Sequence, residues 1–526
     1  MQAITATHHK TIVLVALFSY HNFAIRTMQA SLDKVHGVKT YTIFFKHSQE
    51  NCYNPPTKEE ENLFIQLIRK LQPDLVGFSV ISPYASISRK LTKLVKTNSS
   101  SLVIWGGVHP TIWPENCIND VDLLCVGEGD NVITELAKNL VCGTSYQAMN
   151  NLWIRTDNNI IKNPLRPLIQ DLDSLPFPAY ASSSFFFIYR NKISTFDPVA
   201  KNDTFWIQGS RGCPFRCTYC INESLQDKFR GLGAYVRKRS VENIISEING
   251  NVHKFKNTTK RVLFIDEVFG TSDAWLAKFE ALYKNKIGLP FYIVTNPNIL
   301  DFRKIDKLIN AGVRSINIGI QSGDDFIRRE IFGRQDPIDK IVGIANEVAR
   351  HKVAVKYDFI LDNPYETEYS LKNTIRLLLQ LPRPRFLNIF SLQYFYGYAL
   401  TNKAIKDGHI KAEQLNEKAL LENAVKQFAY LPKQAVFATR KRMLQNMVWL
   451  IGQNLASDTI IKYSVFNDTR VSKLVLFCLN LLSVVFGMII LSLRFLLLRN
   501  MTIYYLITRF VYLFKMNVNS LRWYKQ

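Results

Sequence analysis

Acidic residues are scarce in this chain of 526 residues, with 43 aspartates and glutamates against 66 lysines and arginines. The resulting net charge of +23 suggests an anionic partner, either nucleic acid or a membrane surface. The first residues do not form a secretory signal peptide, because only a short apolar run follows Lys10. We therefore expect a cytoplasmic protein without disulfides. Apolar residues make up 47%, enough for the cores of two or three domains.

Cysteine is also scarce, yet three of the eight cysteines lie within eight residues: Cys213, Cys217 and Cys220. Zinc sites use four ligands, usually paired C-x2-C groups, and no fourth cysteine or histidine is close to these three in the sequence. Three thiolates in one loop can hold an iron–sulfur cluster. Three ligands leave one iron of a [4Fe–4S] cluster open to a small molecule. The remaining cysteines are scattered in apolar surroundings and are interpreted as buried thiols: Cys52, Cys117, Cys125, Cys142 and Cys478.

The C-x3-C-x2-C spacing, with Tyr219 before the last cysteine, resembles the radical S-adenosylmethionine (SAM) superfamily. The resemblance implies that the open iron chelates SAM and that one electron cleaves SAM to a 5′-deoxyadenosyl radical. It also implies a reductant such as flavodoxin or ferredoxin, with the protein supplying position and exclusion of water. A zinc site or a disulfide loop is the alternative interpretation of the three cysteines.

The first domain is predicted to span residues 1–145, where short apolar runs alternate with helical patterns. Strands are expected at 12–18, 38–45, 75–80, 102–105 and 121–126, and helices near 24–35, 58–71, 87–95 and 132–140. This alternation predicts a doubly wound, Rossmann-like parallel sheet. Such sheets bind ligands at the carboxyl ends of their strands.

Three loops at those strand ends, residues 79–84, 106–111 and 127–130, resemble the cobalamin-binding domain of B12-dependent radical SAM enzymes. The resemblance implies cobalamin contacts at Ser79, Gly106, Gly107, Gly127 and Glu128. The Asp-x-His-x-x-Gly motif that gives cobalt a histidine in some B12 proteins is absent. The resemblance therefore implies base-off cobalamin without a histidine ligand, and His21 is interpreted as an ordinary loop histidine. A flavodoxin-like domain with another ligand, or none, is the alternative.

Residues 146–200 are predicted to be a linker with a small hairpin (151–155 and 160–163) and a proline-containing strap (171–180). Strand–helix alternation then resumes over residues 201–430. Strands are expected at 205–208, 262–265, 291–294, 315–319, 354–361 and 386–390, with helices at 241–249, 274–283, 304–311, 337–351 and 369–380. Six such units suggest the open (β/α)6 partial barrel of the radical SAM fold. Catalytic groups gather at strand carboxyl ends in βα barrels, and the cysteine loop follows the first strand.

Other strand ends supply candidate SAM contacts. Asp266 and Glu267 follow the second strand, and Gln321 and Ser322 follow the fourth. The resemblance implies that these four residues, with Tyr219, help to bind SAM. For the acidic pair the alternative is a carboxylate favoured by a helix dipole. The aromatic run 394–398, after the sixth strand, either shapes the substrate pocket or packs in the core.

Residues 431–526 form a basic tail that contains twenty residues without charge, 474–493. As a helix this run is about 30 Å long, one hydrocarbon thickness. A single span would carry the basic end across the membrane, against the positive-inside preference. A helical hairpin with residues 503–514, or helices lying in the interface, removes that conflict. A buried core helix is the alternative, and a nucleic-acid partner is not expected because an uncharged run suits it poorly.

Together these patterns predict a B12-binding radical SAM enzyme of the α/β class that uses a [4Fe–4S] cluster, SAM and cobalamin. The favoured reaction is methylation of an unactivated carbon of a hydrophobic substrate, such as an isoprenoid lipid or a tetrapyrrole, at the cytoplasmic face of a membrane. The first alternative is an oxidative cyclase or rearrangement enzyme that keeps cobalamin without transferring its methyl group. The second is a non-catalytic iron–sulfur or cobalamin sensor.

Overall fold

The computed structural model describes residues 9–47, 55–180, 182–255, 258–425, 429–435 and 437–497. Cys52 and the apolar run 503–514 lie outside the described residues. The chain packs into two compact units. The first comprises residues 1–214, 220–260 and 394–427, and the second comprises 215–219, 261–393 and 428–526. The units cut across the domain boundaries expected at 145, 200 and 430, which stay predictions.

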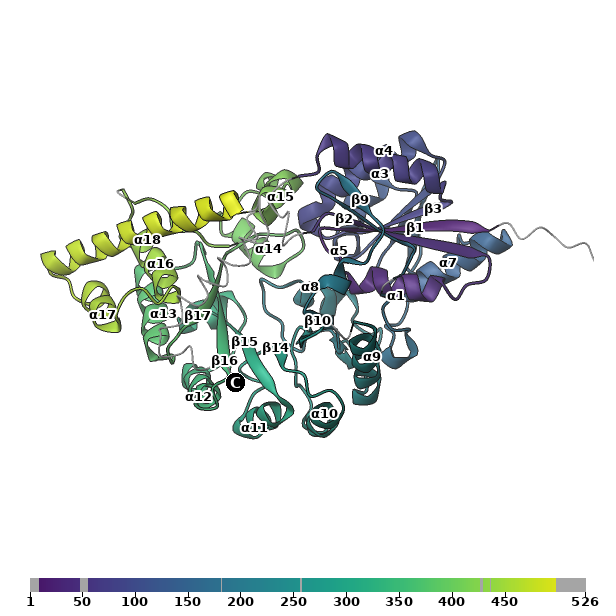
Figure 1. The fold of residues 1–526 in the computed structure, drawn as a ribbon. Helices are drawn as coiled ribbons and strands as arrows, with labels where there is room; N and C mark the ends of the chain where they lie inside the picture. Colours follow the sequence, from purple (N-terminus) through teal and green to yellow (C-terminus); the bar gives the residue numbers. More distant parts are fainter. Residues whose placement is uncertain are drawn as a thin grey trace, which may run out of the picture. The chain divides into compact units, whose positions relative to one another are not determined.

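A nine-stranded sheet in the order β7-β6-β5-β4-β3-β1-β2-β8-β9 forms the centre of the first unit (Figure 1). Its parallel strands are β1 (Lys10–Leu17), β2 (Val38–Phe45), β3 (Leu75–Ser79), β4 (Leu102–Gly106), β5 (Leu123–Cys125) and β8 (Phe185–Tyr189). Helices α3 (Lys58–Leu71) and α4 (Ala85–Asn98) cover one face, and α1 (Phe23–Leu32) and α7 (Asp130–Cys142) cover the other (Figure 1). Burial on both faces explains the continuous apolar runs of the central strands.

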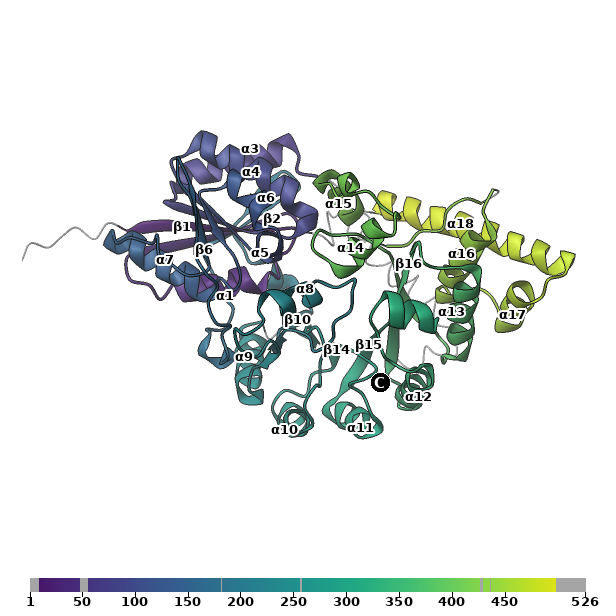
Figure 2. The ribbon, with the colours of Figure 1, turned by 180° about the vertical axis from the view of Figure 1, so that it is seen from behind.

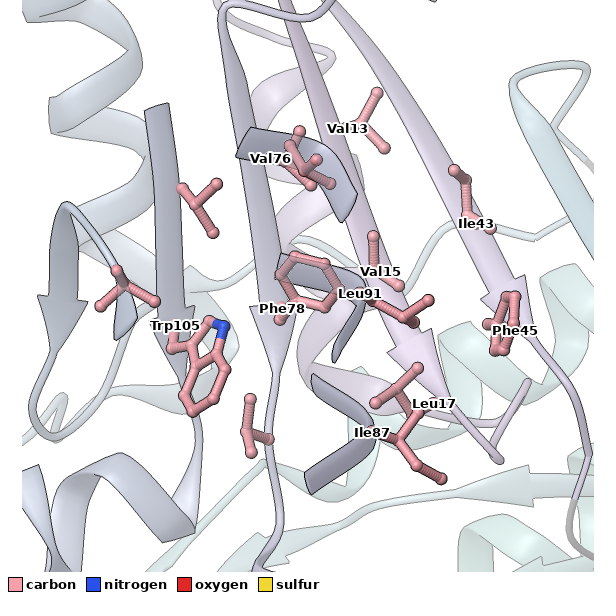
Figure 3. Close-up of a cluster of buried hydrophobic side chains, with 14 of the residues drawn as sticks. Val13, Val15, Leu17, Ile43, Phe45, Val76, Phe78, Ile87, Leu91 and Trp105 are labelled. Carbon is pink, nitrogen blue, oxygen red and sulfur yellow. The ribbon is translucent and has the colours of Figure 1, made fainter. Parts of the chain in front are cut away.

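The core under α3 and α4 is built from side chains that alternate along these strands (Figure 3). Val15, Phe78 and Trp105 point to this face and meet Leu91 of α4 and Phe64 of α3, all buried. Each such side chain contributes about 1.5–3 kcal/mol on burial. The core therefore fixes the strand register, and with it the loops at the carboxyl ends.

Two hairpins extend the sheet at its edges. The expected hairpin is β6 (Leu152–Arg155) and β7 (Ile160–Lys162), and it pairs antiparallel with β5 rather than standing apart as a linker. The second hairpin, β8 with β9 (Lys192–Ser194), was not anticipated from the sequence. The aromatic run of β8 favours a strand, and its parallel pairing with β2 and antiparallel pairing with β9 stabilise it there.

The second unit contains a parallel sheet in the order β13-β14-β15-β16-β17. The strands are β13 (Arg261–Phe264), β14 (Phe291–Thr295), β15 (Val313–Gln321), β16 (Ala354–Leu361) and β17 (Phe386–Ser391). Between them run α10 (Asp273–Lys286), α11 (Phe302–Ala311), α12 (Ile338–Arg350) and α13 (Glu368–Gln380), as expected (Figure 2). The strand before the cysteine loop, β10 (Thr204–Ile207), belongs to the first unit, as does α9 (Val241–Lys254).

Three further helices complete the second unit: α16 (Arg440–Gly452), α17 (Asp458–Phe466) and α18 (Arg470–Leu497). The uncharged run 474–493 lies within α18. By length and composition α18 is apolar enough to cross a membrane, and 28% of its most apolar window is buried.

Three buried histidines make the stability of the first unit depend on pH. Burial lowers the pKa of His21 to about 2 and the pKa values of His47 and His109 to about 4. Because the unfolded chain then binds more protons below pH 6.5, the free energy of unfolding should fall as pH drops from about 6.5 towards 4. Each histidine contributes about 1.4 kcal/mol per pH unit. Urea unfolding at a series of pH values should show this slope, and His109→Gln should reduce it by about one third. An unchanged slope in that variant would contradict the assignment.

Candidate functional site

The three loops expected to bind cobalamin meet at the carboxyl edge of the first sheet. The Val80 amide donates to the Gly106 carbonyl at 2.8 Å, and the His109 amide donates to the Val80 carbonyl at 3.2 Å. The Thr111 hydroxyl donates to the Gly107 carbonyl at 2.7 Å and accepts from the Gly127 amide at 3.0 Å. These bonds join loops that are far apart in sequence into one polar rim.

Gly107 occupies a position that only glycine suits. Its φ is 107°, and an added Cβ would lie 2.7 Å from the Val80 carbonyl oxygen. Gly106 differs, since its added Cβ would meet only Cys125 Cβ at 3.6 Å. On the neighbouring strand, Ser79 Oγ accepts a hydrogen bond from Asn22 Nδ2 at 3.0 Å. The hydroxyl of Ser79 is thereby oriented by the loop that follows β1.

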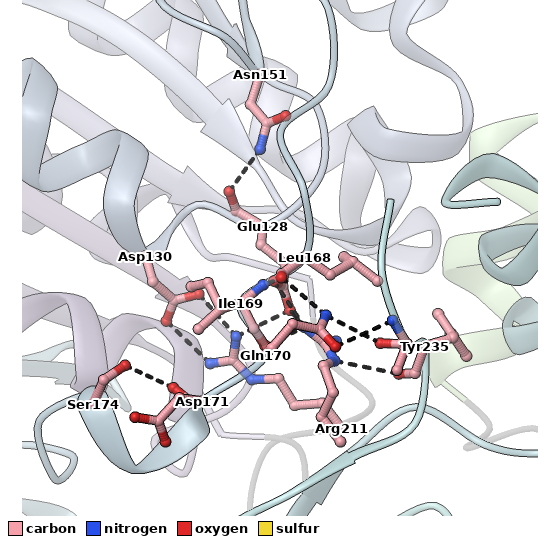
Figure 4. A network of polar contacts seen from close by, with 12 residues as sticks. Glu128, Asp130, Asn151, Leu168, Ile169, Gln170, Asp171, Ser174, Arg211 and Tyr235 are labelled. Carbon is pink, nitrogen blue, oxygen red and sulfur yellow. Dashed lines mark hydrogen bonds and ion pairs between the residues drawn. The ribbon is translucent and has the colours of Figure 1, made fainter. Parts of the chain in front are cut away.

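Glu128 is held by arginines within the first unit (Figure 4). Arg237 Nη1 lies 2.8 and 3.0 Å from the two carboxylate oxygens of Glu128, and Arg211 Nη1 lies 3.2 Å from one of them. Arg211 also forms a two-point ion pair with Asp130, at 2.9 and 3.0 Å. The Ile169 amide donates to Glu128 as well, at 2.9 Å. Glu128 thus joins the loop after β5 to the chain two residues before Cys213.

We expect Glu128→Gln to reduce the free energy of unfolding by about 2–4 kcal/mol, because it removes the partner of the buried Arg237. The matched control is Glu135→Gln, whose half-exposed carboxylate pairs with Arg166 and should cost less than about 1 kcal/mol. Urea unfolding measures both. Unchanged stability together with weaker cobalamin binding would instead place Glu128 among the cofactor contacts.

The two histidines near this edge have different surroundings. His21 stacks on Trp206 with ring centroids 4.1 Å apart, and its Nε2 lies 3.2 Å from Asn202 Nδ2. These contacts support the interpretation of His21 as a packed loop histidine. His109 places Nδ1 3.0 Å from Ser82 Oγ. The buried Nε2 of His109 has no hydrogen-bond partner within the described part of the chain.

The boundary between the units divides the three clustered cysteines: Cys213 and Cys220 belong to the first unit and Cys217 to the second. The carbonyl of Cys213 accepts from Gln226 Nε2 at 3.0 Å, and Cys220 Sγ lies 3.7 Å from Asn222 Nδ2. Over the described ranges, no three His, Cys, Asp or Glu side chains form a preformed metal site. The cluster assignment therefore rests on the C-x3-C-x2-C spacing.

Arg334, in the second unit, is a site residue that the sequence did not indicate. Its Nη1 lies 4.0 Å from Cys217 Sγ and donates to Tyr219 Oη at 3.1 Å. Tyr219 also packs edge-on against Phe332, with ring centroids 5.0 Å apart. Arg334 lies thirteen residues after Gln321 and is not part of a recognisable motif. Its contact with the cysteine loop is therefore visible only in the tertiary structure.

Gln321 lies at the carboxyl end of β15 with a left-handed φ of 70°. The register between β15 and β16 shifts at this point, a distortion that is common beside active sites. Gln321 Oε1 is buried without a hydrogen-bond partner among the described residues. Ser322 is buried, and its hydroxyl accepts from the Asp324 amide at 3.2 Å. The predicted motif thus combines an available acceptor with a hydroxyl that orients the next turn.

The two acidic residues after β13 differ in burial: Asp266 is only 4% exposed, whereas Glu267 is exposed. Both take part in polar interactions. In the first unit, Tyr396 of the aromatic run 394–398 stacks on Trp113 with ring centroids 4.1 Å apart. This stacked pair places residues 394–398 beside the loops of the first sheet. Shaping a substrate pocket was one of the two roles expected for this run.

The residues present fit the expected cofactors in chemical type. Three closely spaced cysteines match an iron–sulfur cluster, and the positive charge of Arg334 beside Cys217 complements a thiolate ligand. Buried polar atoms without partners are expensive. Gln321 Oε1 is therefore suited to accept a hydrogen bond from a cofactor. In the other unit, His109 Nε2 lies 3.9 Å from a carboxylate oxygen of Glu417.

Comparisons with known proteins give the same two modules. The family model of the B12 binding domain matches residues 9–137, and the model of the Radical SAM superfamily matches residues 207–378. An uncharacterized methyltransferase of Pyrococcus horikoshii is 26% identical over 60% of this chain and 66% of its own length. The anaerobic magnesium-protoporphyrin IX monomethyl ester cyclase of Rubrivivax gelatinosus is 21% identical over 59% of this chain and 55% of its own.

A solved structure shares the fold. The radical SAM methyltransferase TsrM of Kitasatospora setae has a TM-score of 0.61 at 13% identity, covering 75% of this chain and 76% of that one. The matches extend over about half to two thirds of the length of the first curated relatives, two methyltransferases and two cyclases. The curated relatives taken together are mostly methyltransferases with some cyclases. The cofactors typical of this family are a [4Fe–4S] cluster, SAM and cobalamin. The chain belongs to the B12-binding radical SAM enzymes and is related to their cobalamin-dependent methyltransferases and anaerobic cyclases.

Proposed function

We propose that this chain is a methyltransferase that replaces a C–H bond of an unactivated carbon with C–CH3. The observation that carries the proposal is the order of modules in one chain, a B12-binding domain followed by a radical SAM domain with a C-x3-C-x2-C loop. Relatives that are named methyltransferases support it.

When bound, the [4Fe–4S] cluster would supply the chemistry for reductive cleavage of SAM, and cobalamin would supply the chemistry of methyl transfer. Cys213, Cys217 and Cys220 hold the cluster. Gln321 accepts a hydrogen bond from SAM through its Oε1. The carboxylates of Asp266 and Glu267 bind a positively charged group or accept a hydrogen bond from a hydroxyl group. The loops at Ser79, Gly107 and Gly127 bind cobalamin.

The proposal is tested by purifying the chain anaerobically with cobalamin, reducing it and adding SAM whose methyl group is deuterated. We expect 5′-deoxyadenosine, a base-off cobalamin spectrum, and deuterated methyl groups in an acceptor. Absence of 5′-deoxyadenosine from a preparation with a reduced cluster would refute it.

A cyclase that binds cobalamin without transferring methyl groups is the second candidate, favoured by the similarity to the Rubrivivax gelatinosus cyclase. That enzyme's name also indicates a tetrapyrrole substrate, which supports a tetrapyrrole as one hydrophobic substrate class. Deoxyadenosine formation coupled to substrate oxidation, with no label in the product, would identify the cyclase.

We also propose that the enzyme works at a membrane surface, where a lipid or tetrapyrrole substrate would be concentrated. The support is α18, because most of its apolar window is accessible rather than packed in a core. Flotation of the full chain with lipid vesicles tests this part separately from the chemistry.

A further inference from the structure

Helix α18 has an inverted distribution of polarity. The stripe that packs onto the rest of the second unit contains three fully buried polar residues, Ser472, Asn480 and Ser483, beside the buried apolar Leu476 and Val484. The opposite stripe is apolar and exposed: Leu474, Leu481, Leu482, Val485, Met488 and Ile489 are each 40–61% accessible. A helix on a water-facing surface normally shows the reverse pattern. An exposed apolar surface of this length, about 22 Å, indicates an interaction site.

Hydrogen bonds fix the polar stripe to the second unit. Asn480 Nδ2 donates to the carbonyls of Gln434 and Ala435 at 3.3 and 2.9 Å. Asn480 Oδ1 accepts from Asn446 Nδ2 at 2.7 Å, and Asn446 Oδ1 accepts from Tyr430 Oη at 2.5 Å. A spanning helix would have to withdraw Asn480 from these partners into hydrocarbon. That exchange is unfavourable because an amide without hydrogen bonds is costly there.

We infer that α18 lies in the plane of an anionic membrane surface, with its exposed apolar stripe in the lipid and its polar stripe on the protein. This inference rests on the membrane part of the proposed function and specifies its geometry. Charge supports a bilayer as the partner, since residues 433–526 contain 13 basic and 2 acidic residues. An in-plane helix also leaves every basic residue on one side of the membrane, which satisfies the positive-inside preference.

The test uses the full chain with vesicles of phosphatidylcholine, with or without phosphatidylglycerol. We expect flotation that increases with phosphatidylglycerol, and release of the bound protein by alkaline carbonate. Replacing Leu482 and Met488 with glutamine should weaken partitioning by about tenfold or more, because both side chains enter the lipid. Tyr369→Gln is the matched control, because Tyr369 is 69% exposed on α13 of the same unit but lies off the stripe.

Each other outcome overturns the inference in a different way. Flotation that resists carbonate would mean that the helix spans, so that the in-plane geometry fails while the membrane proposal survives. Absence of flotation would remove both, without bearing on SAM cleavage. A dimer by light scattering that the Leu482/Met488 variant converts to monomer, without vesicle binding, would show a second copy of the chain on this face.

Discussion

A Cys217→Ala variant is expected to lose the iron–sulfur cluster and reductive cleavage of SAM while it still binds cobalamin. Cys217 is one of the three proposed cluster ligands, whereas the loops proposed to bind cobalamin lie in the first unit and do not include it. Changes to groups that merely contact metal ligands cost about 10–100-fold, so removal of a ligand should reduce 5′-deoxyadenosine formation by more than about a hundredfold. Iron content, the EPR spectrum of the reduced protein and product formation are the measurements.

The control for this variant is Cys142→Ala. Cys142 is an exposed thiol at the end of α7, distant in sequence from the cysteine loop, so its loss should leave iron content and SAM cleavage unchanged. Retained cleavage in Cys217→Ala would refute the ligand assignment. Stoichiometric zinc with little iron in the wild-type protein would favour the zinc alternative instead.

The regular elements followed from sequence because local and tertiary preferences agree in them. Helix α3 occupies the expected residues 58–71, and Thr57 with Glu60 forms a capping box that fixes its start. Strand β16 likewise occupies the expected residues 354–361. In such segments the apolar period, the terminal residues and the burial all favour one structure.

The ion pairs and the loops were less accessible to sequence reasoning. Glu128 occupies a position at which the family resemblance implies a cobalamin contact. Its carboxylate instead accepts hydrogen bonds from Arg211 and Arg237, which lie 83 and 109 residues further along the chain. No local pattern encodes such a pairing. The same holds for Arg334, which reaches Cys217 across 117 residues. The family motif therefore identified the loops, while the partners of each side chain depended on the tertiary fold.

A Gly107→Ala variant should show the opposite separation of cofactors, losing cobalamin while keeping the cluster. The left-handed backbone at Gly107 penalises any Cβ, and this one would approach the Val80 carbonyl oxygen to 2.7 Å. Together these effects should cost about 3 kcal/mol or more locally. The loop must then shift away from β3, breaking the bonds through which Thr111 and His109 connect the three loops.

Gly106→Ala provides a neighbouring control, because its Cβ would make only an ordinary contact of 3.6 Å with Cys125 Cβ and its φ lies outside the left-handed region. Equilibrium binding of cobalamin should weaken by at least about a hundredfold in Gly107→Ala and little in Gly106→Ala. Cluster content should be normal in both. If Gly107→Ala binds cobalamin normally while its urea unfolding confirms the strain, the loop is structural and the cofactor contacts lie elsewhere on the rim. If it loses cobalamin yet still forms 5′-deoxyadenosine, SAM cleavage does not depend on bound cobalamin. The two functions are then separable, as the opposite phenotype of Cys217→Ala would require.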